Sequence, residues 1–152
     1  MNNLDVILKD LNKKEVKIIE DRYLFKAKRL DDGEWVQGYI VKYGFTGQKE
    51  WYIVSDYASD LYSFLIDKNT ICQCTGLKDK NGKLIWENDI VRDRYGNFYI
   101  AFWQSKYYQF SWICIKSDVL MGVKTDLWNF KSSDIEVIGN KFDDPKLLES
   151  GE

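Results

Sequence analysis

The chain has 152 residues, of which 45% are hydrophobic and 30% are charged, and this composition is typical of one folded domain or two small lobes and excludes wholesale disorder. Its 22 Lys and Arg and 24 Asp and Glu give a net charge of -2, so no overall positive field attracts nucleic acid, although a local basic patch is compatible with this balance. The absence of histidine excludes Ser-His-Asp and Cys-His catalysis and histidine metal ligands.

The first predicted element is a short amphipathic helix at the N-terminus. Leu4, Ile7, Leu8 and Leu11 recur at helical spacing, so residues 1–14 are predicted to form a helical extension. The chain does not begin with a basic region followed by an apolar run, and no stretch approaches the ~20 apolar residues that span a bilayer. We therefore expect neither export nor contact with a membrane.

The rest of the chain is predicted to be mainly β, with antiparallel strands in a barrel-like or sandwich arrangement. Strands rich in β-branched and aromatic residues are expected at 16–20, 22–29, 34–42, 50–55, 70–76, 84–86, 89–94, 98–104, 107–116 and 135–138. Two of them, 98–104 and 107–116, are apolar on both faces, which indicates strands that are central or that face a partner chain. The segment 56–67 fits both a helical turn and a strand, and we leave it open.

The predicted domain limits follow from these elements. A β domain is expected over residues 15–148, and it could divide into two lobes at about 15–69 and 70–140. Residues 149–152 are expected to form an acidic tail.

The three cysteines form an odd and unevenly spaced set. This pattern favours reduced thiols in a cytoplasm over the disulfide framework of a secreted protein. Cys72 and Cys74 share one face of a predicted strand, and with Cys114 they could supply at most three thiolates to a metal. Because a free cysteine usually behaves as a small buried hydrophobic residue, we expect all three to be inert and predict neither a metal nor a cofactor.

The run Asp79-Lys80-Asn81-Gly82 begins like a calcium-binding loop. It lacks the glycine and the glutamate that such a loop needs at its sixth and twelfth positions. We interpret it as a hairpin turn, in which Asp79 and Asn81 bond the local backbone and Asn81-Gly82 adopts positive φ values.

Glu87, Asp89 and Asp93 are spaced so that they could share a strand face and form a carboxylate pair for acid-base catalysis. Acids at strand ends and turns more often cap nearby amides or stay solvated. We therefore predict that the protein is not an enzyme.

A basic and aromatic surface is the second candidate site. Glycine-rich nucleotide-binding motifs are absent from the sequence. Single-stranded nucleic acid is instead bound by cations combined with aromatic rings on which bases stack. The residues that could form such a surface are Lys78, Lys80, Lys83, Arg92, Arg94, Tyr95 and Trp103.

The stretch TICQCTGLKDKNGKLIWENDIV, residues 70–91, resembles the most recurrent phrase of the YopX family of phage and prophage proteins. Segments upstream, FKAKR with EWVQGY, and downstream, IEVIGN with DPKLL, are similar to other parts of the family pattern, so that the resemblance covers about residues 22–148. The structural signature that it marks consists of Gln73, Thr75, Gly76, Leu77, Asp79, Asn81, Gly82, Glu87 and Asp89.

Asn88 departs from the family pattern, which has glycine at this position. Because asparagine tolerates positive φ better than most residues, a turn there stays plausible. The resemblance implies a mostly β fold, a phage or prophage setting and a cytoplasmic location. It implies no catalytic residue.

These observations favour a non-enzymatic phage accessory protein that self-associates and engages a host or phage protein. Six Trp, ten Tyr and eight Phe are more aromatic residues than a chain of this size can easily bury in full, and exposed Trp and Tyr often anchor interfaces. The alternative is a single-strand nucleic-acid-binding protein that uses the basic and aromatic set.

Overall fold

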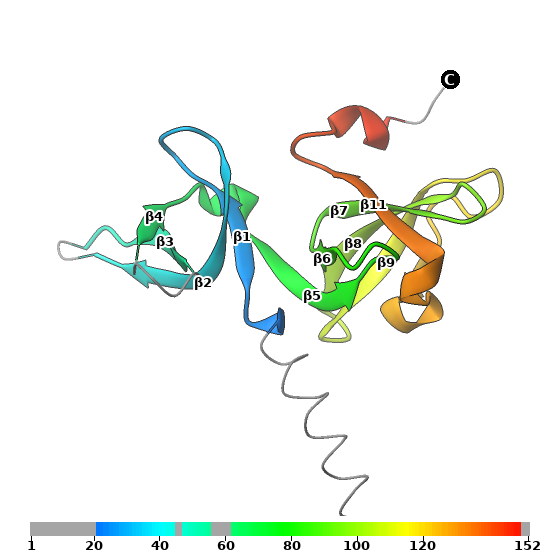
Figure 1. Ribbon diagram of the computed structural model, residues 1–152, viewed down its shortest axis with the longest axis horizontal. Coiled ribbons are helices and arrows are strands. Elements are labelled where there is room, and N and C mark those ends of the chain that lie inside the picture. Colours follow the sequence, from blue (N-terminus) through cyan, green and yellow to red (C-terminus); the bar gives the residue numbers. More distant parts are fainter. Residues whose placement is uncertain (1–20, 45–46, 56–61, 150–152) are drawn as a thin grey trace, which may run out of the picture. The chain divides into compact units, whose positions relative to one another are not determined.

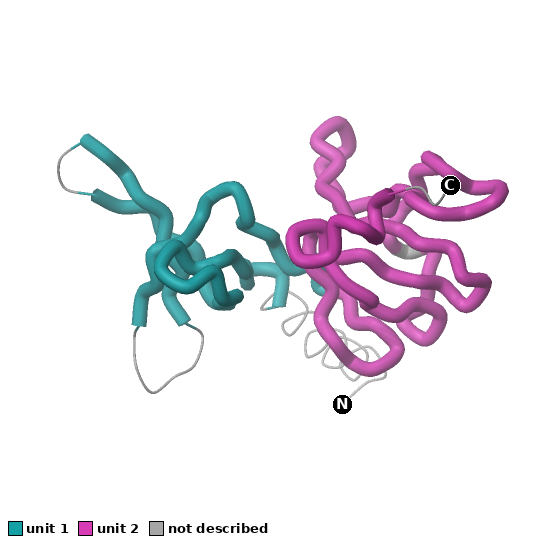
Figure 2. Tube along the Cα trace, turned by 90° about the horizontal axis from the view of Figure 1, so that it is seen from above, with its two compact units in different colours: residues 1–76 teal, residues 77–152 magenta. Residues whose placement is uncertain are grey.

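The computed structural model describes residues 21–44, 47–55 and 62–149 of the chain. The predicted helix at 1–14 and the predicted strand at 16–20 lie outside the described residues. The chain divides into two compact units, residues 1–76 and residues 77–152 (Figures 1 and 2). The sequence placed a division near residue 70, whereas the structure divides the chain after Gly76, inside a strand.

The first unit is built on an antiparallel sheet. Its strands are β1 (Phe25–Lys28), β2 (Trp35–Tyr43), β3 (Glu50–Ser55), β4 (Ser63–Leu65) and the first part of β5 (Cys72–Lys78). The order is β4-β3-β2-β1-β5, and β5 leads on to β6 (Leu84–Trp86) in the second unit. A short 3-10 helix, η1 (Lys68–Thr70), precedes β5.

The core of the first unit lies on one face of this sheet. Ala27 of β1 and Ile53 of β3 are fully buried there, together with Ile66. Because side chains alternate across a strand, residues of the other parity on β2 and β3 point away from this core. These residues form the opposite face of the sheet.

The second unit contains a five-stranded antiparallel sheet in the order β10-β9-β8-β7-β11. The bounds are β7 (Asp89–Asp93), β8 (Phe98–Gln104), β9 (Gln109–Lys116), β10 (Lys124–Asp126) and β11 (Ile135–Asn140). The 3-10 helices η2 (Leu127–Asn129) and η3 (Ser132–Asp134) lie between β10 and β11, and η4 (Pro145–Leu148) follows β11. β8 is the central strand of this sheet, as predicted from the apolar residues on both of its faces.

The core of the second unit is packed between this sheet and the β5-β6 hairpin. Val91, Ala101 and Trp112 of the sheet are buried against Ile85 of β6, and Leu77 at the end of β5 packs on the same cluster. Layers that bury a shared apolar face in this way are typical of a sandwich.

The predicted fold class is confirmed. The protein is mainly β with two antiparallel sheets, and each sheet has two edge strands, so neither closes into a barrel. The open segment 56–67 contains the strand β4, and its residues 56–61 lie outside the described part. Among the described residues, no helix has the length and apolar character that crossing a bilayer requires.

Candidate binding surfaces

The signature turn holds the second unit together. Asp79 is 3% exposed, and its Oδ1 atom accepts hydrogen bonds from the amides of Asn81 at 2.8 Å and Lys83 at 2.9 Å. Its Oδ2 atom accepts from the amide of Val137 at 3.1 Å, which ties the turn to β11. Burial alone would raise the pKa of the Asp79 carboxyl, but these three donors outweigh it and leave the pKa below its ordinary value.

The same turn occurs a second time, between β7 and β8. The Oδ1 atom of Asp93 accepts from the amides of Tyr95 at 2.8 Å and Asn97 at 2.9 Å, as Asp79 does in the first turn. Gly96, three residues after this aspartate, has a φ of 86°. The sequence run Asp-Arg-Tyr-Gly-Asn is therefore structurally equivalent to Asp-Lys-Asn-Gly-Lys.

The backbone of the first turn differs from the prediction at Asn81. Gly82 has a φ of 79°, but Asn81 is not among the described non-glycine residues with positive φ. The aspartate cap favours a turn that needs only one residue in the left-handed region. Asn88 does have a positive φ, of 68°, as its replacement of glycine predicted.

The remaining signature residues also have structural surroundings. The side chain of Gln73 donates to the carbonyl of Arg22 at 3.0 Å, and Asp89 accepts from the amide of Trp86 at 2.9 Å. Thr75 is buried, Gly76 has a φ of 80°, Leu77 packs on the core, and Glu87 is half-buried. The signature is a scaffold of turns and strand ends.

The carboxylates and thiols that could be chemically reactive either accept backbone hydrogen bonds or are buried. Asp89 and Asp93 both accept backbone amides, which matches the capping interpretation of these acids. All three cysteines are free and buried, and burial raises the pKa of the Cys114 thiol. Within the described part of the chain, no group of three or more acids and cysteines could hold a metal ion.

A basic hollow of about 370 Å³ lies at the edge of the second unit. Lys80, Arg92 and Arg94 line it, and each has an acidic neighbour. Glu136 accepts from Lys80 at 2.8 Å and from Arg92 at 3.1 Å, and these two cations lower the pKa of the Glu136 carboxyl. Asp134 lies 3.8 Å from Arg94.

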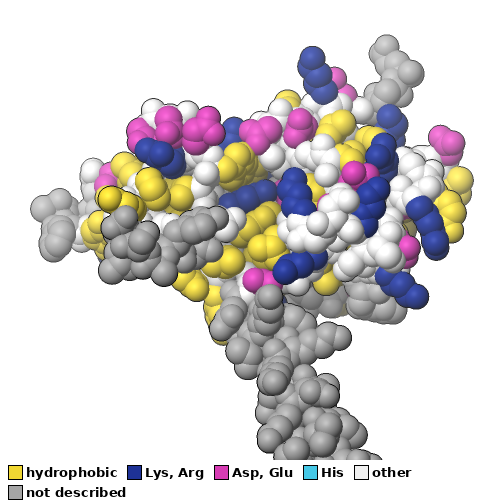
Figure 3. Space-filling view, in the orientation of Figure 1, with side chains coloured by type: hydrophobic (Ala, Val, Ile, Leu, Met, Phe, Trp, Pro, Cys, Tyr) yellow, Lys and Arg dark blue, Asp and Glu magenta, His cyan; other side chains and the backbone are white. Residues whose placement is uncertain are grey.

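The other predicted nucleic-acid residues are only partly gathered around this hollow. Tyr95 is 77% exposed and has the Arg94 guanidinium 5.2 Å from its ring centre. Trp103 lies five residues into β8, roughly 17 Å from the start of the strand, and packs edge-on against Phe110. Lys78 is half-buried and Lys83 is exposed. Figure 3 shows Lys and Arg side chains on the visible face of the second unit, on the right.

The opposite face of the first sheet forms an aromatic face, defined here by Tyr39, Val41, Tyr43 and Tyr52. The first three alternate along β2 and are exposed. Tyr52 lies opposite Val41 on β3, and its ring stacks on that of Tyr43 with 4.4 Å between the centres. The hydroxyl of Tyr52 donates to Glu50 at 2.9 Å, and this bond, with desolvation, raises its pKa to about 12.

Two lysines border the aromatic face. Lys26 and Lys28 of β1 lie over the ring of Trp35, with ammonium-to-centre distances of 5.0 and 5.6 Å. Lys28 is directly opposite Trp35 in the β1-β2 pairing, so these side chains share a face with Tyr39. The surface therefore combines exposed rings with positive charge.

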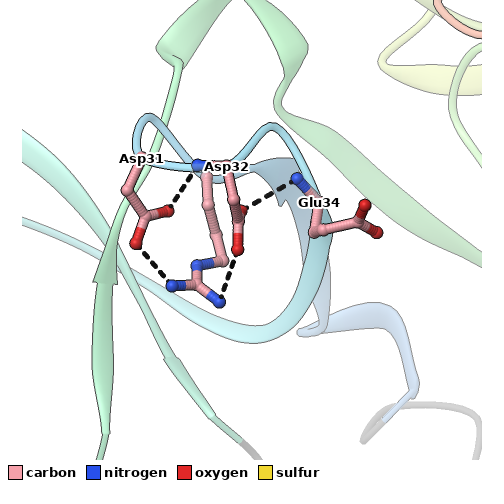
Figure 4. Close-up of polar contacts among 4 residues, drawn as sticks. Asp31, Asp32 and Glu34 are labelled. Atoms are coloured by element: carbon pink, nitrogen blue, oxygen red, sulfur yellow. Dashed lines mark hydrogen bonds and ion pairs between the residues drawn. The ribbon is translucent and has the colours of Figure 1, made fainter.

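The turn between β1 and β2 is fixed by charge (Figure 4). The guanidinium of Arg29 forms ion pairs with Asp31 and Asp32, and it also lies 4.7 Å from the ring centre of Phe64. The hydrogen bond from Arg29 holds the pKa of the Asp31 carboxyl below its ordinary value. Asp32 in turn accepts from the amide of Glu34 at 3.0 Å.

Two apolar features were not predicted from the sequence. The first unit has an apolar hollow of about 260 Å³, lined by Leu30, Trp51, Leu65 and Ile66 with Lys49, Glu50, Asp67, Lys68 and Asn69 around them. The second unit has an apolar loop between β9 and β10, defined here as residues 119–123. Its run Val119-Leu120-Met121 lay outside every predicted strand and was the signal that could have revealed it.

Comparison with known proteins gives a family and similar solved structures. No curated protein matches the chain. The crystal structure of protein EF1440 from Enterococcus faecalis is similar over 82% of this chain and 96% of that chain, with 23% sequence identity and a TM-score of 0.45. The family profile described as YopX protein matches residues 24–149. Because this match covers most of the described fold, the chain belongs to the YopX family.

Proposed function

We propose that the protein is a non-enzymatic binding module that engages a protein partner through the aromatic face and that also self-associates. The observation that carries this proposal is the exposure of Tyr39, Val41 and Tyr43 in one row, on the side of the sheet that does not form the core. Exposed large apolar side chains gathered on one surface are typical of protein contacts.

The rings of the aromatic face are partly ordered before any partner binds. Tyr43 and Tyr52 stack on each other, so little side-chain freedom is left for a partner to remove. Tyrosine also offers a hydroxyl at the edge of an apolar ring, and this combination is common at the centre of interfaces. A sheet face of this kind suits a partner that is itself a folded protein.

The charges bordering the aromatic face indicate what kind of partner it suits. Lys26 and Lys28 place two positive charges beside Trp35. A complementary surface has apolar residues at its centre and acidic residues at its rim.

Non-enzymatic action is supported by how the reactive groups are used. Asp79, Asp89 and Asp93 accept backbone amides, and the thiols are buried. We place the protein in the bacterial cytoplasm as a phage or prophage accessory protein. Its free cysteines support a reducing compartment.

Affinity capture with paired variants tests the proposal. Tagged wild type, Tyr39→Ser/Tyr43→Ser and the control Tyr107→Ser are incubated with lysate of a bacterial host, in parallel with and without nuclease treatment, and bound proteins are identified by mass spectrometry. The control removes a similarly exposed tyrosine from the second unit. We expect a defined host or phage protein that wild type and Tyr107→Ser retain and the double variant loses.

Two results would contradict the proposal. The first is equal retention of the same protein by all three baits, which would move the interface away from the aromatic face. The second is captured material that disappears from every bait after nuclease, which would indicate nucleic acid as the ligand.

Single-stranded nucleic acid is the second candidate ligand. The favourable observation is that Lys80, Arg92 and Arg94 line one hollow beside the exposed ring of Tyr95. The ion pairs with Glu136 and Asp134 oppose it, because a phosphate must compete with these carboxylates. If this candidate holds, an oligonucleotide binds with an affinity that falls steeply with salt and falls further in Arg94→Ala.

A further inference from the structure

We propose that Asn81 is a site of spontaneous deamidation and that the hydrogen bonds of the signature turn, defined here as residues 79–83, hold this reaction back in the folded protein. The modification replaces the side-chain amide of Asn81 by a carboxylate without an enzyme. The inference does not depend on which partner the protein binds, so it goes beyond the proposed function and is tested separately from it.

The reaction uses only atoms of Asn81 and Gly82. The backbone nitrogen of Gly82 loses its proton and attacks Cγ of Asn81, so that an N–Cγ bond forms and the bond from Cγ to the side-chain nitrogen breaks. Ammonia leaves and carries that proton away. Water then opens the cyclic imide on one side or the other, which gives an aspartate or an isoaspartate at position 81.

Asn81 is the asparagine of this chain that best fits these demands. It is the only one that glycine follows in the sequence, and a residue with a Cβ atom at the next position crowds the attacking nitrogen. Asn81 and Gly82 are both exposed, so water reaches the imide. A Cβ atom built on Gly82 would meet no atom of the described residues within 4 Å, and the surroundings therefore leave room for the reaction.

The folded turn occupies the attacking nitrogen. The amide of Gly82 donates to the carbonyl of Asp79 at 3.0 Å. The Oδ1 atom of Asp79 accepts from the amides of Asn81 and Lys83, on either side of that nitrogen. The Gly82 nitrogen reaches Cγ of Asn81 only after its peptide plane has turned away from Asp79, and this rotation breaks the first of these bonds.

The charge of Asp79 and its links to β11 protect Asn81 further. The Asp79 carboxylate is buried, and a deprotonated amide would be a second negative charge beside it, which makes loss of the Gly82 proton harder. The amide of Lys80 donates to the carbonyl of Ile135 at 3.0 Å, and Asp79 accepts from the amide of Val137. Opening the turn therefore disturbs contacts within the second unit.

The products would change this turn in two ways. An isoaspartate adds one CH2 group to the main chain, so the amide of Asp79 and the carbonyl of Lys83, now bonded at 2.9 Å, no longer meet in the same register. Either product adds a negative charge next to Lys80, which lines the basic hollow. Anion exchange therefore separates modified from unmodified molecules.

The rate is measured on the full-length protein by peptide mapping with mass spectrometry, since exchange of NH2 for OH changes the mass of the peptide that contains Asn81. The protein is incubated at mildly alkaline pH in native buffer and in urea that unfolds it. Asn97, which Phe98 follows, is the internal control. We expect Asn81 to react in urea while Asn97 stays intact. In native buffer Asn81 should react at least about ten-fold more slowly, which corresponds to an opening free energy of about 1.4 kcal/mol.

Two variants separate the turn from the rest of the fold. Asp79→Ala removes the acceptor of the turn amides, whereas the control Val91→Ala removes apolar contacts from the core of the same unit and leaves the side chains of the turn in place. Urea denaturation gives the unfolded fraction of each variant, and the rates are compared at equal unfolded fraction. We expect Asn81 to react faster in Asp79→Ala. If Asp79→Ala does not fold, Asp79→Asn replaces it.

The second turn offers a transplant. Tyr95→Asn places an asparagine before Gly96, whose amide donates to the carbonyl of Asp93 at 3.2 Å, as that of Gly82 donates to Asp79. Because Asp93 caps this turn as Asp79 caps the first, we expect the new asparagine to react in urea and to be protected in native buffer.

Four results would overturn the inference. Asn81 that stays intact in urea would remove the site, and equal rates in native buffer and in urea would remove the protection. Equal rates in Asp79→Ala and Val91→Ala at equal unfolded fraction would assign the protection to the unit as a whole and not to the turn. Reaction of the Tyr95→Asn variant in native buffer at its rate in urea would show that a turn of this kind does not protect.

Discussion

Asp79 and Asp93 show how single residues organise the second unit. Each accepts two amides of the turn that follows it, and Asp79 also accepts one from β11. Buried carboxylates that look catalytic in a sequence can therefore be devices for satisfying backbone donors that would otherwise be lost to the interior.

Replacement of Asp79 by asparagine tests this role. The amide side chain keeps one acceptor oxygen but presents N–H groups to the Val137 amide, which is itself a donor. We expect a loss of about 2–3 kcal/mol in the free energy of unfolding, measured by urea denaturation. Asp118→Asn, at an exposed position, is the control and should change the stability little. Equal stability of the two variants would contradict the assigned role.

The lowered pKa of Asp79 predicts a pH dependence with a definite sign. Because the folded-state pKa lies below the ordinary value of 3.8, the ionised carboxylate stabilises the fold above that pH. This contribution is lost as the pH falls through the lowered pKa. Urea denaturation at a series of pH values should therefore show wild type losing stability below about pH 4 more steeply than Asp79→Asn. Parallel pH profiles would contradict the prediction.

The strands were the part of the fold that the sequence predicted best. β3, β6 and β8 have their predicted limits, because β-branched and aromatic residues fill them between clear turn signals. β10 was missed because three residues, Lys124–Asp126, carry no periodic pattern, and it forms by pairing with β9.

The candidate surfaces could be predicted only in part. Lys80, Arg92 and Arg94 were visible in the sequence, but the acids that pair with them, Asp134 of η3 and Glu136 of β11, lie much later in the chain. The aromatic face depends on which alternate residues of β2 point toward the core. The pairing of β2 with its neighbouring strands determines this. The apolar hollow could not be predicted from the sequence, because the residues that line it come together only in the folded unit.

Gly38 gives a prediction at the scale of the strand pair. A Cβ atom there would lie 1.9 Å from the carbonyl oxygen of Val54, which belongs to the paired strand. Gly38→Ala must therefore push β2 and β3 apart, at a cost of about 2–3 kcal/mol or more in thermal or urea unfolding. Gly33→Ala meets no atom within 4 Å and adds only the strain of a φ of 75°. It should cost less, and an equal loss would contradict the close packing.

At the scale of the whole molecule, each unit has its own core and its own candidate surface. The first unit buries Ala27 and Ile53 and exposes the aromatic face on the other side of the same sheet. The second unit buries Trp112 and carries the basic hollow and the apolar loop. These exposed surfaces support the proposal that the chain acts by binding a protein partner.

The exposed tyrosines make that claim directly measurable. Nitration of tyrosine, read by mass spectrometry, reports how accessible each ring is in the purified protein and in the complex captured from nuclease-treated lysate. Tyr39 and Tyr43 should become protected in the complex while Tyr95 and Tyr107, both exposed on the second unit, stay reactive. Protection of Tyr95 with continued reaction of Tyr39 and Tyr43 would contradict binding through the aromatic face and assign partner binding to the basic hollow.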